Sequence, residues 1–527
     1  MSESVDAAPP DAAIISTAKG SGFLAAGSLF EFASRFLIAI VLARALGATD
    51  YGLYVLAVSA AGIFAGVASL GLDDAIMRYV AILSGRRDRA AIVGTLQIGL
   101  TGSVLAGVAI GGALFAAASP IADGLFDEPR LASLLRVIAV AVPFLTLSNV
   151  LGGSARGFGK MEFVAIAENG VQSIVRVGAT VAIVIVTGTI DVTQATVAFV
   201  ASDLAASAVF VGLILRHFPV DRAAVRAAER PIGPVVRFAA PLWIASLLRQ
   251  SRRNFETVLL GSSRSVSSAG IYSIVDKVNL FGHVWLLSLF VAVKPELARL
   301  HDRGDRAGLA RLYATATRWS LELTLPFVLV AIVFREPIMR MFGDSFAAGA
   351  TALAVLACAE LVNAATGVCG PAIDMTGHTR AKVVNSVVLT AILIGSNALL
   401  IPRWGVVGAA VASLLGITVF NVLCIAEMWV LERVLPFDRS FWKPAVAGAG
   451  AFALGLWLSA WLPFETSFAT LLVGAPITCA AYGVLLLSFG LPREDRLVIG
   501  RATAKFTRPL QRRQRDTRAL GAEAVAP

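Results

Sequence analysis

The chain has 527 residues, of which 57% are hydrophobic and 15% are charged, and its mean hydropathy is +0.78. An apolar fraction this high excludes an ordinary soluble enzyme of this size and indicates a membrane protein. The formal charge of +10 is typical of basic loops beside anionic lipids, and no DNA-binding motif accompanies it, so nucleic acid is not expected as a partner.

The apolar residues are gathered into runs of about 20, the length that an α-helix needs to cross about 30 Å of hydrocarbon. Six spans are predicted in the first part of the chain, near residues 22–46, 51–71, 91–117, 131–153, 163–187 and 192–215. Six more are predicted near residues 238–261, 269–293, 315–334, 349–373, 381–401 and 405–430. Two further runs, near residues 444–462 and 467–490, bring the predicted total to fourteen.

These runs predict an all-α polytopic membrane protein with two parallel six-helix repeats plus two C-terminal helices. Its predicted parts are a cytoplasmic N-terminal tail (1–21), a first six-helix bundle (22–215), a cytoplasmic linker (216–237), a second six-helix bundle (238–430), two extra transmembrane helices (431–490) and a basic cytoplasmic tail (491–527). The predicted outer loops carry few basic residues, namely Arg130, Arg264, Arg335, Arg340 and Arg403. The positive-inside rule therefore places both termini in the cytoplasm.

An internal repeat is visible at a shift of 218 residues. This shift places Gly52 on Gly270, within the stretches DYGLYVLAV and AGIYSIVDK. The same shift places Gly159 on Gly377, without a gap, in a second pair of similar stretches. Because each copy contains an even number of spans, the two copies enter the membrane with the same orientation and can enclose a central cavity.

A family resemblance is carried by residues 27–80, which read GSLFEFASRFLIAIVLARALGATDYGLYVLAVSAAGIFAGVASLGLDDAIMRYV. This stretch resembles the opening helices of bacterial polysaccharide flippases of the Wzx type. Similarity to the seventh and eighth helices of the same family is carried by RFAAPLWIASLLRQSRRNFETVLLG and AGIYSIVDKV. These flippases belong to the multidrug/oligosaccharidyl-lipid/polysaccharide (MOP) exporter superfamily, with lipid II flippases and MATE drug exporters as relatives. The resemblance extends over about residues 22–430.

The resemblance implies a transporter that flips polyprenyl-pyrophosphate-linked oligosaccharide from the inner to the outer leaflet of the bacterial cytoplasmic (inner) membrane, by alternating access. Its product would serve O-antigen, capsule or exopolysaccharide synthesis, with polysaccharide polymerase and chain-length proteins as candidate partners beside the membrane lipids. No cofactor or metal is predicted, since the four cysteines lie in apolar runs without metal-site spacings.

Two other transporter functions stay open, a MATE-like cation-coupled drug antiporter and a lipid II flippase for peptidoglycan. A polytopic glycosyltransferase or ligase is a further alternative, and it would need catalytic acids or histidines in a sizeable periplasmic region. The outer loops are short and no catalytic constellation is present in the sequence, so an enzyme is not expected.

Ionisable residues inside the predicted spans are costly in hydrocarbon and are therefore candidates for function. If helices 1, 7 and 8 line the cavity, as the resemblance implies, its charge is net positive and suits a pyrophosphate, because guanidinium groups hold phosphate oxygens bidentately. The candidate pyrophosphate-binding residues are Arg35, Arg249, Arg252, Arg253 and Lys277, and the candidates for ion pairing or coupling are Glu31, Glu256, Asp276, Glu168 and Asp203.

A competing interpretation gives these charges a purely structural role. Glu31 and Arg35 lie four residues apart on one helix face, and Arg252 stands at the same spacing from Glu256. Such pairs can hold helices together without contacting a substrate. His283, inside the eighth predicted span, is interpreted as a hydrogen-bonded packing residue.

Overall fold

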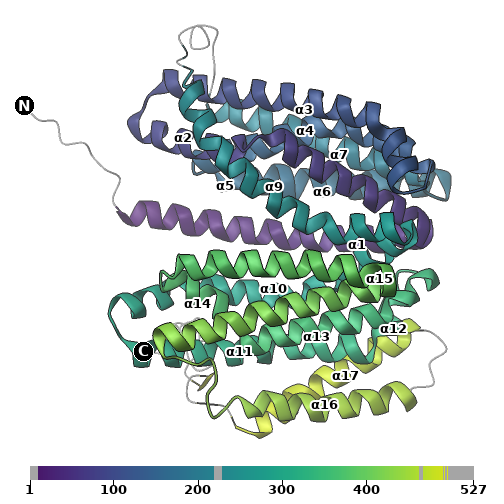
Figure 1. Cartoon of the computed structure of the whole chain (residues 1–527), viewed down its shortest axis with the longest axis vertical. Helices are drawn as coiled ribbons and strands as arrows, with labels where there is room; N and C mark the ends of the chain where they lie inside the picture. The colour runs from purple at the N-terminus through teal and green to yellow at the C-terminus, as the bar shows by residue number, and fades with distance from the viewer. Residues whose placement is uncertain are drawn as a thin grey trace, which may run out of the picture. The chain divides into compact units, whose positions relative to one another are not determined.

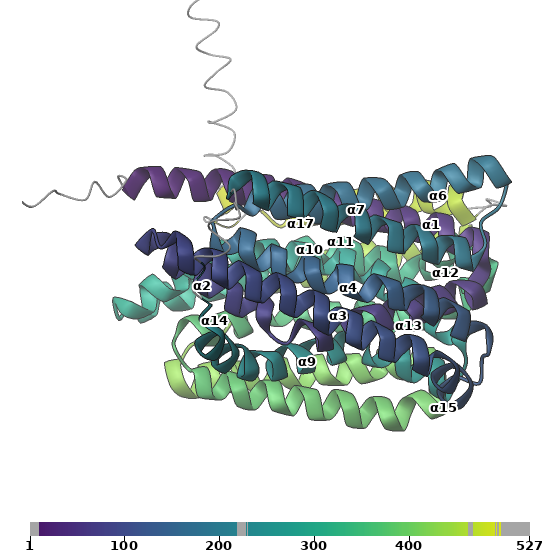
Figure 2. The same ribbon diagram turned by 90° about the horizontal axis from the view of Figure 1, so that it is seen from above.

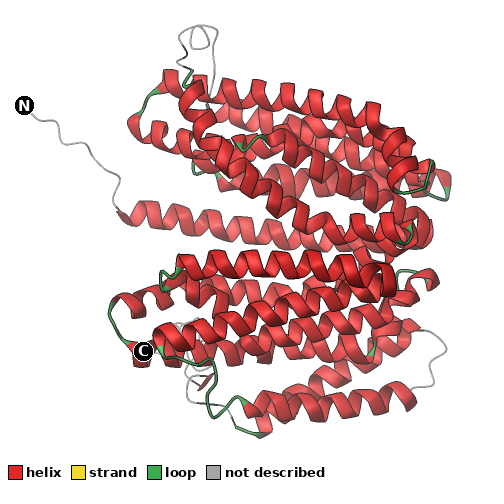
Figure 3. Ribbon diagram, in the orientation of Figure 1, coloured by secondary structure: helices red, strands yellow, loops and turns green. Residues whose placement is uncertain are grey.

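The structure, a computed structural model, describes residues 10–218, 228, 230–461, 467–490, 492, 495 and 496. Side chains are described from Phe30 onward, and Arg249, Arg252 and Arg253 are among those outside the described set. Within the described residues every regular element is a helix, as the secondary-structure colouring of Figure 3 makes plain. The predicted all-α polytopic fold is confirmed.

The first part of the chain forms eight helical elements, labelled in Figure 1 where there is room. These are α1 (Pro10–Ser69), α2 (Leu72–Arg86), α3 (Arg89–Leu125), α4 (Arg130–Gly157), α5 (Met161–Val164), the π-helix η1 (Ala165–Gln172), α6 (Ser173–Thr187) and α7 (Val192–His217). A π-helix carries one extra residue per turn and is common at functional sites.

The second part contains the remaining described elements. These are α9 (Ile232–Ser263), α10 (Val266–Asp302), α11 (Arg306–Val333), α12 (Arg335–Arg340), the 3₁₀ turn η2 (Asp344–Gly349), α13 (Ala350–Thr366), α14 (Cys369–Met375), α15 (Thr379–Glu432), α16 (Trp442–Trp461) and α17 (Ser467–Ser488).

Two of these helices are broken by a glycine with a positive φ angle. In α1 the break is at Gly47 (φ 71°, ψ 177°), and in α15 it is at Gly405 (φ 56°, ψ −129°). Side chains with a Cβ rarely adopt such φ values, so glycine is the residue that permits each break. Eleven of the described helices are long and apolar enough to cross a membrane, and α1 and α15 each count once among them despite their breaks. The total of fourteen spans stays a prediction.

Backbone contacts divide the chain into two compact units. The first comprises Met1–Val278, Glu336–Leu356 and Thr390–Ser413, and the second comprises Asn279–Arg335, Ala357–Leu389 and Leu414–Pro527. In the first unit α4 packs against α1, α2, α3 and α7, and Figures 1 and 2 agree in placing α3 beside α4. Leu72, Ile76 and Val150 belong to a buried apolar cluster in this unit. The predicted boundaries of the two six-helix bundles stay predictions.

The repeat-related glycines Gly52 and Gly270 meet in a close helix crossing inside the first unit. A Cβ added to Gly52 would lie 2.0 Å from the carbonyl oxygen of Val266, and one added to Gly270 would lie 2.4 Å from that of Ala48. Ala48 and Val266 are themselves related by the shift of 218 residues, so the two contacts are reciprocal. The shift of 218 residues thus relates both the two glycines and the two residues whose carbonyl oxygens they approach.

Replacing Gly52 or Gly270 by alanine is therefore expected to destabilise the folded protein by about 1–3 kcal/mol, as overpacking does where the obstacle is backbone. Gly112 is the matched control, because no atom lies within 4 Å of a Cβ added there. The apparent unfolding temperature of the detergent-purified protein should fall for Gly52→Ala and stay unchanged for Gly112→Ala. Equal temperatures for both variants would contradict the close crossing.

The two C-terminal helices pack inside the second unit, where α16 and α17 contact each other and α11. Leu325 of α11, Ala447 and Ala451 of α16, and Tyr482 of α17 share one buried cluster. Small side chains on α16 let its backbone approach its neighbours closely, which is how helices associate in a membrane.

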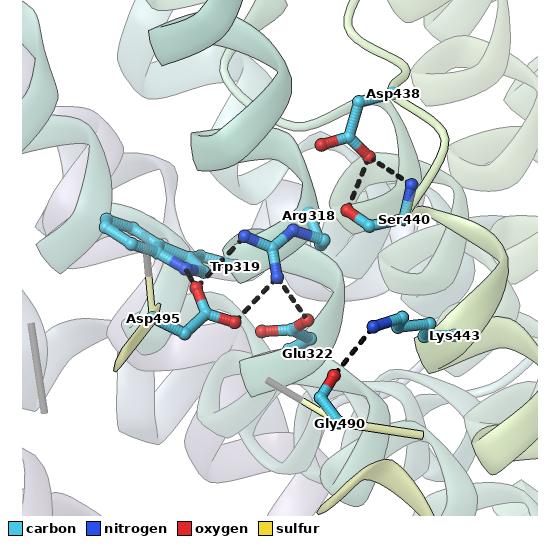
Figure 4. A network of polar contacts seen from close by, with 8 residues as sticks. All are labelled: Arg318, Trp319, Glu322, Asp438, Ser440, Lys443, Gly490 and Asp495. Carbon is cyan, nitrogen blue, oxygen red and sulfur yellow. Dashed lines mark hydrogen bonds and ion pairs between the residues drawn. The ribbon is translucent and has the colours of Figure 1, made fainter. Parts of the chain in front are cut away.

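A polar network anchors the segment after α17 to α11 (Figure 4). The guanidinium of Arg318, only 1% exposed, donates to the two carboxylate oxygens of Asp495 at 2.7 and 3.0 Å and contacts Glu322 at 3.3 Å. The indole N–H of Trp319 also donates to Asp495, at 2.7 Å. Lys443 donates to the carbonyl oxygen of Gly490 at 2.6 Å, which is a second polar contact to the segment after α17.

Replacing Asp495 by alanine is expected to lower stability by about 3 kcal/mol, at the low end of the cost of breaking a buried ion pair because Glu322 remains. Thermal unfolding of the purified protein measures the effect. Glu296→Ala is the control, since its partner Arg299 is 67% exposed and a surface pair contributes little. If the two variants unfolded at the same temperature, the network would not be an anchor.

Candidate functional site

The first unit contains a cavity of about 370 Å³ that carries an excess of basic side chains. More than one lining residue comes from each of α1, α9 and α10, and one each comes from α4, η1, α6 and α7. Among the side chains that the structure describes, Arg35, Arg176 and Lys277 are the basic lining residues and Asp276 is the acidic one. Clefts of a few hundred Å³ with a few convergent polar groups are typical ligand sites.

Arg35 lines this cavity from α1 and is paired with Glu31 one helical turn earlier. The guanidinium lies 2.5 Å from the Glu31 carboxylate, and 56% of the Arg35 side chain is exposed. A guanidinium carries five N–H donors, so pairing with one carboxylate is compatible with binding an anion on another edge. The predicted i,i+4 pair is therefore present, at the wall of the cavity.

Lys277 and Asp276 enter the cavity from α10. The Lys277 ammonium donates to the hydroxyl of Ser273 and lies 5.7 Å from the ring centre of Tyr51. An aromatic face attracts a cation through the electrostatic field of the ring, without neutralising its charge. The Lys277 side chain thus lies beside a cavity wall that also contains aromatic surface.

Arg176 lines the cavity from α6, and sequence reasoning did not single it out as a binding residue. Its guanidinium lies 3.9 Å from Asp203, 3.1 Å from the hydroxyl of Ser202 and 4.4 Å from the ring centre of Phe199, all on α7. Gln172, the last residue of the π-helix, also donates to Asp203. Asp203, a predicted pairing residue, is only 2% exposed and is held by both partners.

Glu256 and Glu168 are not among the lining residues of the cavity. Glu256 on α9 accepts hydrogen bonds from Tyr272 at 2.8 Å, Ser413 at 3.0 Å and Asn397 at 3.4 Å. Glu168 on η1 lies 2.9 Å from where a Cβ on Gly152 would be. Glu256 therefore joins α9, α10 and both segments of α15 within the first unit.

The structure brings together three of the ten predicted site residues as cavity walls, namely Arg35, Asp276 and Lys277, with Glu31 beside them. Arg249, Arg252 and Arg253 lie outside the residues whose side chains the structure describes. Asn254, one position further along α9, does line the cavity. In the second unit His283 contacts Glu360 at 3.2 Å, as a hydrogen-bonded packing histidine should.

Comparison with known families identifies two overlapping regions. The family model described as polysaccharide biosynthesis protein matches residues 17–301, more than half of the chain. The model described as MatE matches residues 241–399.

Individual relatives are distant in sequence. The probable flippase AglR of Haloferax volcanii is 25% identical over 41% of this chain, and the match spans only 45% of that protein. Stage V sporulation protein B of Bacillus subtilis is 23% identical over 92% of this chain and 98% of its own length.

A solved structure of the lipid II flippase MurJ, in an inward closed conformation, superposes with a TM-score of 0.70. At 13% identity it covers 88% of this chain and 98% of that one, which establishes a common fold. The match to the polysaccharide biosynthesis model covers the helices that build the basic cavity. The chain therefore belongs to the polysaccharide biosynthesis protein family, and its apolar helices are those of a multi-pass membrane protein.

Proposed function

We propose that this protein flips polyprenyl-pyrophosphate-linked oligosaccharide from the inner to the outer leaflet of the bacterial cytoplasmic membrane, for the synthesis of surface polysaccharide. The observation that carries the proposal is the cavity whose described lining contains the bases Arg35, Arg176 and Lys277 and one acid, Asp276. A pyrophosphate diester is anionic, and basic side chains in a partly desolvated cavity compensate that charge better than water-exposed ones do.

Two carboxylates near the cavity, Glu31 and Asp203, form ion pairs with its arginines. Glu31 pairs with Arg35, and Asp203 pairs with Arg176, so neither guanidinium sits in the empty cavity as an isolated charge. An isolated buried cation would be costly, and Asp203 reduces that cost for Arg176, whose side chain is only 12% exposed. When the pyrophosphate enters, its oxygens accept hydrogen bonds from the guanidinium groups of Arg35 and Arg176.

The distribution of the basic lining residues over the two predicted repeats supports a mechanism of alternating access. Arg35 and Arg176 belong to the first predicted repeat, whereas Lys277 belongs to the second. A head group held by both repeats stabilises the state in which they close around it, which is the differential binding that a conformational change requires. The polyprenyl tail remains in lipid throughout. Polysaccharide polymerase and chain-length proteins are the proposed partners on the outer face.

A second candidate function is a MATE-like drug antiporter, favoured by the MatE match at residues 241–399. Drug cations would be repelled by the three basic lining residues, which is why we place this function second. A lipid II flippase is a third candidate, because it carries the same pyrophosphate on a different saccharide.

Proteoliposomes of one protein preparation separate these candidates. Two flipping assays are run, one with a fluorescent undecaprenyl-pyrophosphate oligosaccharide and one with lipid II. In parallel, uptake of ethidium is measured under an imposed proton or sodium gradient. We expect flipping of the oligosaccharide lipid and no ethidium uptake. Ethidium uptake without lipid flipping would transfer the assignment to the antiporter, and flipping of lipid II alone would transfer it to peptidoglycan synthesis.

A further inference from the structure

A second cavity, of about 350 Å³, lies in the first unit at the ends of three helices. Tyr79 and Leu83 line it from α2, Ala91 from the first turn of α3, and Arg230 and Pro231 from the two positions just before α9. We call this cavity the arginine pocket. None of the described residues lines both this pocket and the cavity that contains Arg35.

The arginine pocket lies in a strongly basic part of the chain. Arg86, Arg87 and Arg89 are exposed and flank Asp88, the acid among its lining residues. Asp88 is occupied as the N-cap of α3, where its carboxylate accepts from the amide of Ala91 at 3.0 Å. Among the described residues, these three arginines and Arg230 outnumber the one capping carboxylate, which leaves a positive excess at this place.

Two of the guanidinium groups are held by neutral partners. Arg230 donates to the side-chain carbonyl of Gln97 at 2.9 Å, and the guanidinium of Arg78 lies 4.3 Å from the ring centre of Phe238. The Tyr79 ring, on the pocket wall, packs edge-on against Phe238 at 6.3 Å. Aromatic faces and amide oxygens orient an arginine without cancelling its charge, so its positive charge persists at the pocket.

The predicted location of the pocket at the cytoplasmic surface indicates which class of anion binds its arginines. Residues 86–89 form the connection between the second and third predicted spans, and Arg230 belongs to the predicted linker 216–237; both are predicted to be cytoplasmic. The structure brings these two segments to one cavity. Basic pockets between helices at the cytoplasmic surface are where anionic lipid head groups bind.

We propose that the arginine pocket binds the phosphate head group of an anionic phospholipid of the inner leaflet. The guanidinium of Arg230 contacts the phosphate, Arg86 and Arg87 add long-range attraction, and the walls formed by Tyr79, Leu83 and Pro231 cover the glycerol region. The proposal does not depend on which substrate is transported, so it can be tested independently of the flippase assignment.

Native mass spectrometry of the full-length protein tests the proposal, with dioleoyl-phosphatidylglycerol as the probe and dioleoyl-phosphatidylcholine as the neutral comparison. Wild type should retain phosphatidylglycerol preferentially. Arg230→Ala should weaken its binding about fivefold, and Arg86→Ala/Arg87→Ala by more, since each arginine near an anionic surface contributes about 1 kcal/mol. Arg303→Ala/Arg306→Ala is the matched control, because both residues are exposed and belong to another loop predicted to be cytoplasmic; its binding should equal that of wild type.

Three results would overturn the proposal. These are equal retention of the two lipids, wild-type affinity in the pocket variants, and equal losses in the pocket and control variants. Competition by millimolar inorganic phosphate would identify a soluble anion as the ligand in place of a lipid. Unfolding temperatures of all variants, measured in parallel, ensure that a loss of binding is not a loss of folding, and Arg230→Lys should retain part of the affinity.

Discussion

A disulfide between residues 48 and 345 is expected to stop lipid flipping. In the first unit the amide of Ala48 donates to the Ser345 hydroxyl at 3.2 Å, and Arg44 donates to the carbonyl oxygen of Met341 at 2.7 Å. Phe36 packs edge-on against Phe342, with ring centres 5.6 Å apart. These contacts join the middle of α1 to the segment around η2, at the face predicted to be outside, and alternating access requires them to separate.

The variant Ala48→Cys/Ser345→Cys should flip lipid normally when reduced and lose at least about tenfold in rate when oxidised, a change of about 1.4 kcal/mol or more in the limiting step. Each single-cysteine variant, treated with the same oxidant, is the control for the four native cysteines. Restoration of flipping by reductant completes the test. A fully cross-linked protein that flipped at the wild-type rate would show that this contact does not open during transport.

Reversing the charge of Lys277 is expected to have the second large effect. Lys277→Glu would leave two basic lining residues, Arg35 and Arg176, against two acidic ones, and would place the new carboxylate beside Asp276. The positive excess of the cavity would be lost and a pyrophosphate would meet like charges. Binding of a short-chain, water-soluble prenyl-pyrophosphate saccharide should weaken at least about tenfold, equivalent to about 1.4 kcal/mol.

The control for this prediction separates charge from shape. Lys277→Met keeps the length of the side chain without its charge, so it should give an intermediate affinity, and Lys277→Arg should stay near wild type. The affinity of wild type should also fall with ionic strength more steeply than that of Lys277→Glu. Affinities that are equal for Glu, Met and Arg at this position would assign Lys277 a packing role.

Local patterns in the sequence were sufficient to predict much of the fold and part of the candidate site. Runs of apolar residues predicted the helices, and the spacing of four residues predicted the Glu31–Arg35 pair, because both signals are contained in one helix. The shift that aligns Gly52 with Gly270 predicted a repeat, and the reciprocal crossing of these glycines agrees with it.

Contacts between distant segments could not be predicted in the same way. Arg176 meets Asp203 on another helix, and the π-helix that precedes α6 has no sequence signature that sets its phase. Glu256 accepts from Asn397 and Ser413, residues 141 and 157 positions away. Pairings of this kind depend on how helices cross, which a single sequence does not specify.

In the proposed function, the basic cavity carries a lipid-linked pyrophosphate across the membrane. The most direct test of this function is flipping of fluorescent undecaprenyl-pyrophosphate oligosaccharide in proteoliposomes that contain wild type, Arg35→Ala, Arg176→Ala or the surface control Arg299→Ala at matched protein levels. We predict protein-dependent flipping in wild type and Arg299→Ala, and a loss of at least about tenfold in both cavity variants. The proposed function of the basic cavity would be contradicted if both cavity variants flipped the lipid at the wild-type rate, or if wild type did not flip it.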